Sequence, residues 1–365
     1  MAERIQALLK SMKKQNIDSM FITSKANVYY ITNYYTEPHE RLVAVYISNH
    51  FDPLLIIPAM EEEDAKAAGW RYQIITYHDH ENPWEMFYQK LKTNEHIPNT
   101  ISVEHTNLTL DRYQLMQQLF SNTRIVNGEE LLANLRVIKS EKEYNLLKHA
   151  AELADFGIKT GIAAIQEGVG ELEVIAKIEY ELKKQGIQEM SFSTMTLSGT
   201  KTASPHGTPS MKKIKSGDIV LFDLGVVYEG YCSDISRTVA FKSITEQQKK
   251  IYNTVLEAEQ KAIAASKIGV ATGKLDQIAR NHIADAGFGE YFTHRIGHGL
   301  GIETHEYPSM HSNNDLPLQA GMCYTIEPGI YVPGVAGVRI EDMIYMTEQG
   351  PEVLTTSPKE LMILE

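Results

Sequence analysis

The sequence predicts an α+β protein with two domains, and three observations support this prediction. Short apolar runs alternate with helical pieces through about the first 125 residues. Two long helices, each preceded by a capping-box pattern, follow in the rest of the chain. Each long helix leads to a second helix and then to strand-like segments that include a hairpin. A smaller α/β domain therefore precedes a larger domain with a weak internal duplication.

The first domain is expected to contain a small mixed sheet. It opens with a helix whose apolar face contains Ile5, Leu8, Leu9 and Met12. Strands are expected at 19–23, 42–47, 53–58 and 72–77. Helical pieces are expected around 60–68, 84–92 and 110–119. This domain offers no cluster of metal-ligand residues, so metal chemistry is expected in the second domain.

The second domain begins near Arg136 and contains the duplication. Ser140 and Glu143 form the first capping-box pattern. Thr245 and Gln248 form the second. The two long helices are expected to end at about residues 165 and 266. After each comes a Gly-Val turn, a second helix and a glycine, in 167–186 and again in 267–287. Two copies related by a pseudo-twofold axis would place their hairpins face to face; a chance similarity of amphipathic helices is the alternative.

The composition excludes several classes of partner. The 365 residues include 35 Lys and Arg against 47 Asp and Glu, a net charge of −12, so no nucleic acid and no membrane partner is expected. Two cysteines provide no disulfide framework. The N-terminal residues lack the apolar run of a signal peptide, and no stretch reaches the roughly 20 apolar residues that span a bilayer. A soluble, cytoplasmic protein is therefore expected.

Five side chains in the second domain have the character of metal ligands: Asp223, Asp234, His298, Glu327 and Glu341. Four carboxylates brought together without cations would repel one another. Two divalent cations would balance them, with +4 against −4. Oxygen donors with one imidazole suit Mn, Co, Zn or Fe better than a thiolate site would. The first hypothesis is therefore a hydrolytic centre with two metals.

The first hairpin explains how two of these acids meet. A two-residue turn at Glu229 and Gly230 pairs residues whose numbers sum to 459, so Asp223 faces Ser236. Because side chains alternate with period two, Asp234 lies on the same face as Asp223. The two are then diagonal neighbours, about 7–8 Å apart at the backbone. A four-residue turn would place them directly opposite, whereas a three-residue turn would separate them.

The second hairpin, 322–346, contains the other two acids. Its turn is expected within 333–337, and a turn centred on Gly334 brings Glu327 opposite Glu341. Apolar neighbours indicate that this region is buried, and a buried acid needs a partner. The alternative to metal binding is a set of ion pairs with arginine, and the candidates are Arg237, Arg295 and Arg339.

Histidines complete the candidate site. His298 shares a glycine-rich, strand-like segment, 294–306, with His294 and His305. Its glycines allow the backbone to approach a ligand closely. His206 lies in a loop rich in glycine and proline, 204–209, which suits the wall of a site.

These residues lie in motifs that resemble those of the metallopeptidase family with the pita-bread fold. That family includes methionine aminopeptidase, aminopeptidase P and prolidase. The matching motifs are FDLGVVYEGYCSDISRT (222–238), GHGLG (297–301) followed by HE (305–306), IEPGIY (326–331) and GVRIEDM (337–343). The first domain is similar to the creatinase/prolidase branch, and EPHERLVAVYI (37–47) looks like the bacterial prolidases. The resemblance implies an N-terminal creatinase-like α/β domain (1–125), a linker (126–137) and a catalytic pita-bread domain (138–365).

The resemblance also implies roles for the five ligands. Asp234 and Glu341 would bridge two divalent metal ions per chain. Asp223 would complete the site of one ion, and His298 and Glu327 the other. Manganese is the expected metal, with cobalt or zinc as alternatives. Glu327 would also accept the proton of the attacking water.

Further residues are implied to contact the substrate. His206 and His305 would contact the substrate and the developing oxyanion. Arg339 would hold Glu341 or the substrate carboxylate, with a purely structural ion pair as the alternative. Lys201 stands where relatives often carry Asn or Arg, which leaves the fine substrate preference open.

The function implied by the resemblance is metal-dependent hydrolysis of the Xaa-Pro bond, preferentially in dipeptides. Proline's nitrogen has no hydrogen, so a site that holds the ring by shape and the carboxylate by charge is required. An Xaa-Pro aminopeptidase acting on longer peptides is the nearest alternative, and a non-catalytic binding protein on the same fold is another. A homodimer is expected, in which the loop with His39 could close the site across the interface.

Overall fold

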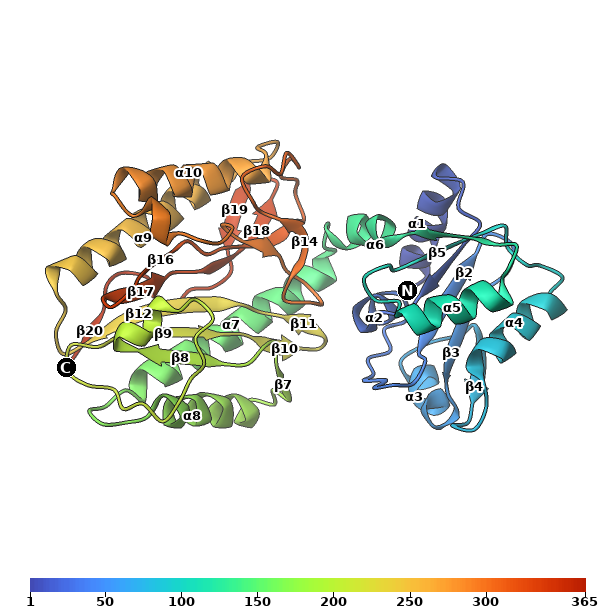
Figure 1. Cartoon of the computed structure of the whole chain (residues 1–365), viewed down its shortest axis with the longest axis horizontal. Helices are drawn as coiled ribbons and strands as arrows, with labels where there is room; N and C mark the ends of the chain where they lie inside the picture. The colour runs from blue at the N-terminus through green and yellow to red at the C-terminus, as the bar shows by residue number, and fades with distance from the viewer. The chain divides into compact units, whose positions relative to one another are not determined.

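The computed structural model describes residues 1–365, which divide into two compact units, Met1–Arg136 and Val137–Glu365 (Figure 1). Each unit has its own hydrophobic core. Residues 126–137, for which a linker is predicted, contain the end of β6 (Arg124–Asn127) and helix α6 (Glu129–Arg136). Leu131 and Leu132 of α6 are buried, and α6 contacts α1 (Ala2–Lys14). Residues 126–136 are therefore part of the N-terminal unit, and Val137 is buried in the core of the C-terminal unit. No helix in the chain combines the length and apolar character that crossing a membrane requires.

The N-terminal unit is a mixed six-stranded sheet with helices. Its strands are β1 (Ser19–Ile22), β2 (Ala44–Ser48), β3 (Leu54–Pro58), β4 (Gln73–Tyr77), β5 (Thr100–Val103) and β6, in the order β4-β3-β2-β1-β5-β6. Its other helices are α2 (Lys25–Thr32), η1 (Ala59–Glu61), α3 (Glu62–Ala67), α4 (Pro83–Thr93) and α5 (Leu110–Leu119). Strand β1 is antiparallel to β2 and parallel to β5, which confirms the predicted mixed sheet. Phe21, Tyr46 and Phe87 are fully buried in its core.

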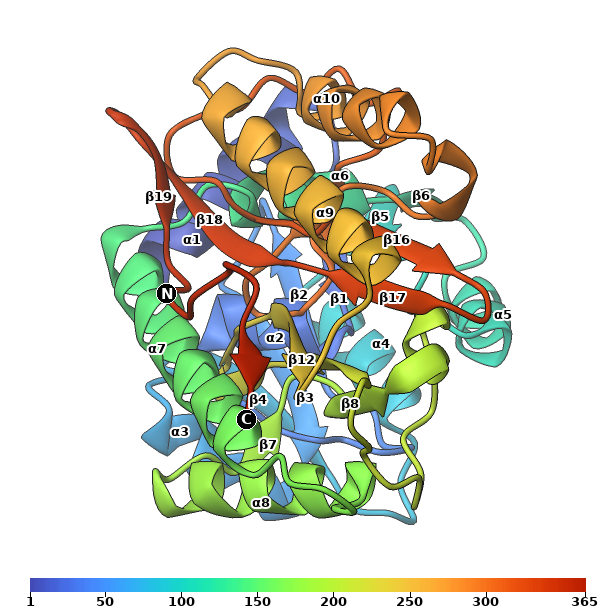
Figure 2. The ribbon, with the colours of Figure 1, turned by 90° about the vertical axis from the view of Figure 1, so that its left-hand side faces the viewer.

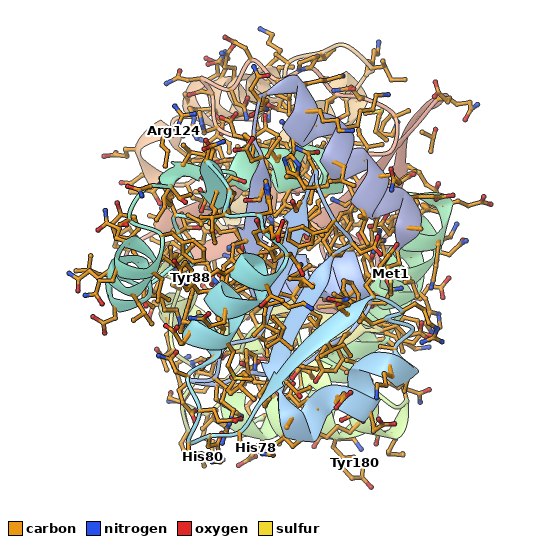
Figure 3. The ribbon with its side chains drawn as sticks, turned by 90° about the vertical axis from the view of Figure 1, so that its right-hand side faces the viewer. Met1, His78, His80, Tyr88, Arg124 and Tyr180 are labelled. Carbon is orange, nitrogen blue, oxygen red and sulfur yellow. The ribbon has the colours of Figure 1, made fainter.

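Histidines in the N-terminal unit lie near one another without forming a metal-ligand group. His78 and His80, labelled in Figure 3, follow β4. Their rings stack with centroids 5.8 Å apart. Asp79 between them pairs with Arg41 at 2.8 Å. The group of three or more convergent metal-ligand side chains in this chain lies elsewhere, at Asp234, His298 and Glu341.

The C-terminal unit contains four long helices and several small sheets. Its helices are α7 (Glu141–Ala163), α8 (Glu171–Lys184), η2 (Gly199–Ala203), α9 (Glu246–Ala265), α10 (Thr272–Asp285) and η3 (Gly289–Tyr291). Its first strands are β7 (Glu189–Met190), β8 (Met195–Ser198), β9 (Ile219–Leu224), β10 (Val226–Tyr228), β11 (Tyr231–Cys232) and β12 (Ile235–Phe241). The later strands are β13 (His298–Gly299), β14 (Glu306–Ser309), β15 (Cys323–Ile326), β16 (Gly329–Val332), β17 (Ala336–Arg339), β18 (Asp342–Thr347), β19 (Gly350–Val353) and β20 (Ile363–Leu364).

Both predicted capping boxes are present, at the starts of α7 and α9. In each box a hydroxyl accepts from a backbone N–H three residues later, and the side chain there returns the bond. Because both long helices begin with this reciprocal pair, the predicted starts are confirmed.

The duplication is visible in matching backbone bonds. Gly168 N donates to Ile214 O at 2.9 Å, and Gly269 N donates to Leu318 O at 2.8 Å. These glycines, just before α8 and α10, have φ values of 80° and 84°. Glycine adopts this left-handed conformation without the steric cost that a Cβ brings. The two helix–helix–hairpin units are therefore built alike.

The two helix pairs lie on opposite sides of the strands. Figure 1 shows α9 and α10 on one side of the strands of the C-terminal unit and α7 and α8 on the other; Figure 2 shows the same arrangement from the end. One core cluster contains Ile158, Ile178 and Phe222 from the first copy. Another contains Val255, Leu275 and Ile344 from the second. The hairpins meet between these two cores.

The registers of both hairpins agree with the sequence prediction. Asp223 pairs with Ser236, and Tyr228 pairs with Tyr231, so the turn is the two residues 229–230. In the second hairpin Val332 pairs with Ala336, so the turn centres on Gly334. The same register, continued to the pairing of Ile326 with Asp342, places residues 327 and 341 opposite each other.

Candidate active site

All five side chains with metal-ligand character line one cavity in the C-terminal unit, with a volume of about 720 Å³. Asp223 lies on β9, and Asp234 directly precedes β12. His298 begins β13, Glu327 directly follows β15, and Glu341 directly precedes β18. The two hairpins are joined where Glu341 N donates to the carbonyl of the residue opposite Asp223, at 3.1 Å. Residues more than a hundred positions apart therefore share one small space.

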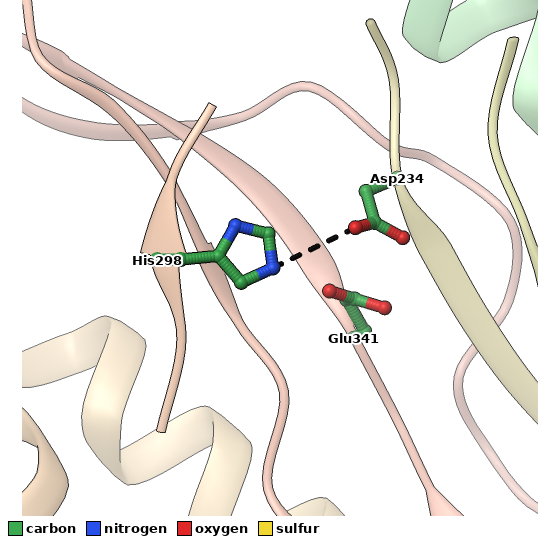
Figure 4. Close-up of side chains that lie close together, drawn as sticks. All are labelled: Asp234, His298 and Glu341. Carbon is green, nitrogen blue, oxygen red and sulfur yellow. Dashed lines mark ion pairs between the residues drawn. The ribbon is translucent and has the colours of Figure 1, made fainter. Parts of the chain in front are cut away.

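Asp234, His298 and Glu341 form the closest group (Figure 4). Their ligand atoms lie within 4.8 Å of one another. His298 Nε2 lies 3.7 Å from Asp234 Oδ2 and 3.4 Å from Glu327 Oε1. His298 Nδ1 lies 3.1 Å from Gly299 O, so a proton on Nδ1 leaves the Nε2 lone pair directed at the carboxylates. This is the tautomer that a metal-binding imidazole needs.

Burial and mutual repulsion shift the pKa values of these groups strongly. Burial, together with the neighbouring Glu341, raises the pKa of Asp234 and of Glu327 well above the usual values. Burial and the nearby Asp223 raise the pKa of Glu341 to about 7. Burial and the neighbouring His305 lower the pKa of His298 to about 3. An uncompensated acid cluster of this kind resists full ionisation near neutral pH.

Two carboxylate oxygens in the cluster indicate that cations would fit here. Asp223 Oδ1 and Glu341 Oε1 are buried and have no hydrogen-bond partner. The other oxygen of Glu341 accepts from Ser236 Oγ at 2.8 Å. Buried polar atoms are normally paired, so an orphaned anionic oxygen calls for an explanation. Carboxylate oxygens with one neutral imidazole are a donor set that suits hard to borderline divalent cations.

Arg339 contacts a different acid from the one expected. Its guanidinium donates to Asp223, to Ser236 Oγ at 2.8 Å and to Tyr331 Oη at 3.0 Å. It makes no hydrogen bond to Glu341, and its ion pair with Asp223 is of the structural kind given as the alternative; contact with the substrate carboxylate stays a prediction. Ser236 links the two instead, because its hydroxyl donates to Glu341 and accepts from Arg339. Arg339 is 4% exposed and therefore supports the acid cluster from within the protein.

The other two arginines form no ion pair with the acids of the cluster. Arg237 pairs with Asp342 at 2.6 Å, on a fully buried contact. Arg295 lines the cavity and donates Nη1 to Ser309 Oγ at 2.8 Å. The ion-pair alternative therefore accounts for one of the five side chains, the acid bound by Arg339.

Three histidines line the cavity beside His298. The rings of His298 and His305 meet edge to face, with centroids 4.1 Å apart. His206 also lines the cavity. His294 Nε2 lies 3.0 Å from Tyr331 Oη. Burial lowers the pKa of His305, and burial with the nearby Arg339 guanidinium lowers that of His294 to about 4. The imidazoles of His294 and His305 are therefore neutral near pH 7, able to donate one hydrogen bond each.

Two other residues singled out from the sequence, His39 and Lys201, are not among those that line the cavity. His39 belongs to the N-terminal unit, where its φ is 52°, and its contact with substrate stays a prediction. Lys201 donates to Glu171 at 2.6 Å and does not line the cavity. Its side chain is therefore occupied by another residue of the chain.

Several lining residues were not identified from the sequence: Ser191, Phe192 and Thr304. Ser191 and Phe192 lie in the short connection between β7 and β8, where no periodicity exists. Only the folded chain brings that connection to the cavity.

Comparison with known proteins identifies the families to which both parts of the chain are similar. Residues 145–348 match the model of Metallopeptidase family M24, and residues 4–138 match the Creatinase/Prolidase N-terminal domain. The Bacillus subtilis (strain 168) protein named "Putative dipeptidase YkvY" is 51% identical over 361 residues, which cover 99% of each chain.

Solved structures resemble the chain over nearly its whole length. An Xaa-Pro dipeptidase from Bacillus anthracis has a TM-score of 0.93 and 35% identity, covering 100% of this chain and 99% of that chain. An X-Pro aminopeptidase from Thermotoga maritima MSB8 has a TM-score of 0.85 and 30% identity, covering 96% of this chain and 98% of that chain. Taken with the convergent acids and imidazole, these matches show that the chain belongs to metallopeptidase family M24, as a hydrolase of peptide bonds with a creatinase-type N-terminal domain and a pita-bread C-terminal domain.

Proposed function

We propose that this protein hydrolyses the Xaa-Pro bond of dipeptides with two divalent metal ions, manganese being the expected metal. The observation that supports this most is the cavity itself. It combines four convergent carboxylates and an imidazole with three further histidines, two arginines and apolar side chains. The first group suits metal ions, and the remainder suits a short peptide that ends in proline.

The proposed metal ligands are the five side chains at the cavity. Asp234 and Glu341 would be shared by both ions, Asp223 would complete one, and His298 and Glu327 would complete the other. When bound, the ions would polarise the scissile carbonyl and lower the pKa of a water molecule. Their +4 charge would also offset the mutual repulsion that raises the carboxyl pKa values.

Glu327 is the proposed proton acceptor. Its carboxylate lies in the cavity, 3.4 Å from His298, and its side chain is 16% exposed, so water can reach it. It would take the proton of the attacking water and return it to the leaving nitrogen. His305 and His206, on other parts of the wall, would donate hydrogen bonds to the developing oxyanion.

The proline ring would be recognised by shape. Phe192 and Pro205 line the cavity and offer apolar surface to a ring. Proline's nitrogen carries no hydrogen once it forms a peptide bond. A site that forms no hydrogen bond to the scissile amide nitrogen therefore binds this substrate without losing an interaction.

Arg295 is a better candidate than Arg339 for the substrate carboxylate. The guanidinium of Arg339 already serves Asp223, Ser236 and Tyr331. Arg295 lines the cavity, and its hydrogen bond to Ser309 uses one nitrogen of the fork. A bidentate contact with a free carboxylate therefore remains open to it. This is the feature that would favour dipeptides.

The Xaa-Pro aminopeptidase alternative keeps a specific basis, the 30% identity to the Thermotoga enzyme over most of both chains. It differs in accepting peptides that extend beyond proline. A non-catalytic binding protein is disfavoured because no ligand position is lost. The proposal also includes a homodimer, in which His39 of a second copy contacts the substrate. Sedimentation of the wild-type protein tests the dimer. Activity of H39A, measured with its sedimentation, tests the contact from His39.

The deciding experiment compares Ala-Pro, Ala-Pro amide and Ala-Pro-Ala with defined manganese loading. We expect kcat/KM to fall at least tenfold from the dipeptide to its amide and to the tripeptide. Arg295→Met should remove that preference, since the charge that selects the carboxylate is gone. Equal rates on all three substrates would support the aminopeptidase, and no hydrolysis by fully loaded protein would overturn the peptidase proposal for Xaa-Pro bonds.

A further inference from the structure

One buried carboxylate outside the cavity holds both ends of a cavity wall. Glu171 begins α8 and is completely buried. Its Oε1 accepts from Ser198 N at 2.9 Å and from Ser198 Oγ at 3.0 Å. Its Oε2 accepts from Ser210 N at 2.9 Å and Ser210 Oγ at 3.2 Å. Lys201 Nζ donates to the same oxygen at 2.6 Å. The carboxylate therefore closes the loop 198–210 with five hydrogen bonds.

This loop forms part of the cavity wall. Pro205 and His206, near its middle, both line the cavity. The loop also contacts the second hairpin, because Gly337 N donates to Thr202 Oγ1 at 2.7 Å. A Cβ on Gly337 would lie 1.9 Å from Thr202 O, so the hairpin and the loop pack backbone to backbone. The loop is thus held at its ends by α8 and at its middle by the hairpin that contains Glu341.

Burying a charge at the start of a helix needs a reason beyond stability. A buried ion pair contributes little net stability, because desolvation offsets most of the attraction. A helix start can be satisfied by a solvent-exposed cap, as Glu173 does two residues later by accepting from Gly170 N at 3.2 Å. All the donors around Glu171 lie on the loop, so their hydrogen bonds favour one loop conformation. These bonds offset the conformational entropy that the loop loses when it is ordered.

We propose that Glu171, with Lys201 as its counterion, is a positioning residue that holds His206 in the cavity wall. The proposal rests on the proposed function, in which His206 stabilises the oxyanion. Lys201, on this view, affects catalysis through Glu171 and not through contact with the substrate.

The test is a double-mutant cycle on dipeptide hydrolysis with E171Q, H206A and the combined variant. E173Q is the matched control, because Glu173 lies on the same helix in a half-exposed pair with Lys213. We expect E171Q to lower kcat about tenfold with KM within twofold, and E173Q to change neither. In the H206A background, E171Q should lower kcat by less than about twofold, since its route of action is already removed.

Additive losses in the cycle, with manganese content unchanged, would overturn the positioning role. Wild-type kcat in folded E171Q would overturn it too. Wild-type kcat in H206A would instead remove the oxyanion role from the proposed function, which is a separate failure. If E171Q does not fold, K201M takes its place in the cycle, with K201R as the conservative rescue; additivity of K201M with H206A then counts against the proposal in the same way.

Discussion

The two copies within the C-terminal unit share a scaffold and contribute different chemistry. In the first copy a two-residue turn leaves Asp223 and Asp234 as diagonal neighbours on one face. In the second a turn centred on Gly334 places Glu327 directly opposite Glu341. The shorter acids lie in the diagonal pair and the longer acids in the direct pair. The duplication thus determines where the two hairpins meet. The length of each turn and of each acidic side chain determines the position of each carboxylate group.

The second helix of each copy also contains a buried acidic residue, and the two residues support different segments of the cavity wall. Glu171 of α8 holds the loop 198–210. Asp276 of α10 accepts from Ile296 N at 2.9 Å and pairs with Arg280, which donates to the carbonyl of His294 at 2.8 Å. One acid therefore supports the wall at His206, and the other supports the segment that contains Arg295. The same device, placed on equivalent helices, orders two unrelated loops.

The largest expected effect on kcat comes from replacing one acidic residue of either hairpin. Glu327→Gln should lower kcat about 10³-fold or more, because the amide cannot accept a proton. Asp234→Asn should be as damaging through loss of metal. Elemental analysis alongside kcat separates the two: E327Q is expected to keep at least part of its metal with no turnover. The exposed Glu348→Gln is the control, and E327Q with wild-type turnover would remove the assignment of the base.

After metal removal, the stability of the protein should depend on pH, because the two acid pairs repel each other when ionised. The folded-state pKa of Glu341 is raised from its ordinary value to about 7, and those of Asp234 and Glu327 are raised as well. The metal-free native state therefore binds more protons than the unfolded state between about pH 4.5 and 7, and its stability falls as pH rises through that window.

The measurement is Tm against pH with and without manganese. Metal-free protein should lose several degrees between pH 5 and 7.5, a loss on the order of a few kcal/mol. Loaded protein should behave in the opposite way, since its ligands bind metal when deprotonated. Parallel curves for the two forms would show that these carboxylates are not the site that the metal occupies.

A smaller effect is expected from the acid of the second copy. Asp276→Asn weakens the anchor of residues 292–296, so Arg295 is held less firmly. We expect KM for Ala-Pro to rise about fivefold while kcat stays within twofold, which contrasts with the kcat effect expected for E171Q. Asp285→Asn, at the exposed end of the same helix, is the control. A fall in kcat at unchanged KM would show that the two acids act alike.

The smallest effect should be the same in both copies. Gly168 and Gly269 have nearly equal positive φ, and a Cβ on either would meet nothing within 4 Å. Alanine at either position should therefore cost about 1–2 kcal/mol of unfolding free energy from backbone strain alone, with kcat unchanged. Chemical denaturation of G168A and G269A measures this, and a difference above about 1 kcal/mol would show that the copies are less alike than their hydrogen bonds indicate.

Much of this arrangement could be predicted from particular residues. The capping pairs at Ser140 and Thr245 mark both long helices, and the residues 229–230 mark the first turn. Other elements were missed, among them α2, β5, β6 and α6. These are short, and β5 and β6 have few strongly apolar residues, so their stability comes from pairing with β1 and with each other. The segment 294–306 was expected to be strand-like, yet only His298–Gly299 and Glu306, the first residue of β14, belong to strands there.

The sequence alone determined the five candidate ligands and the hairpin face on which the four acids lie, because strand periodicity and turn length are local properties. The tertiary structure decided which arginine meets which acid. Arg339 donates to Asp223 and to Ser236, the residue at which the two hairpins meet. Arg295 lines the same cavity and donates only to Ser309 there, so it is the arginine with donors available to a substrate. The tertiary structure also decided that Lys201 serves Glu171 and that Phe192 reaches the cavity. Such contacts join positions far apart in the chain, and no local pattern encodes the distance between them.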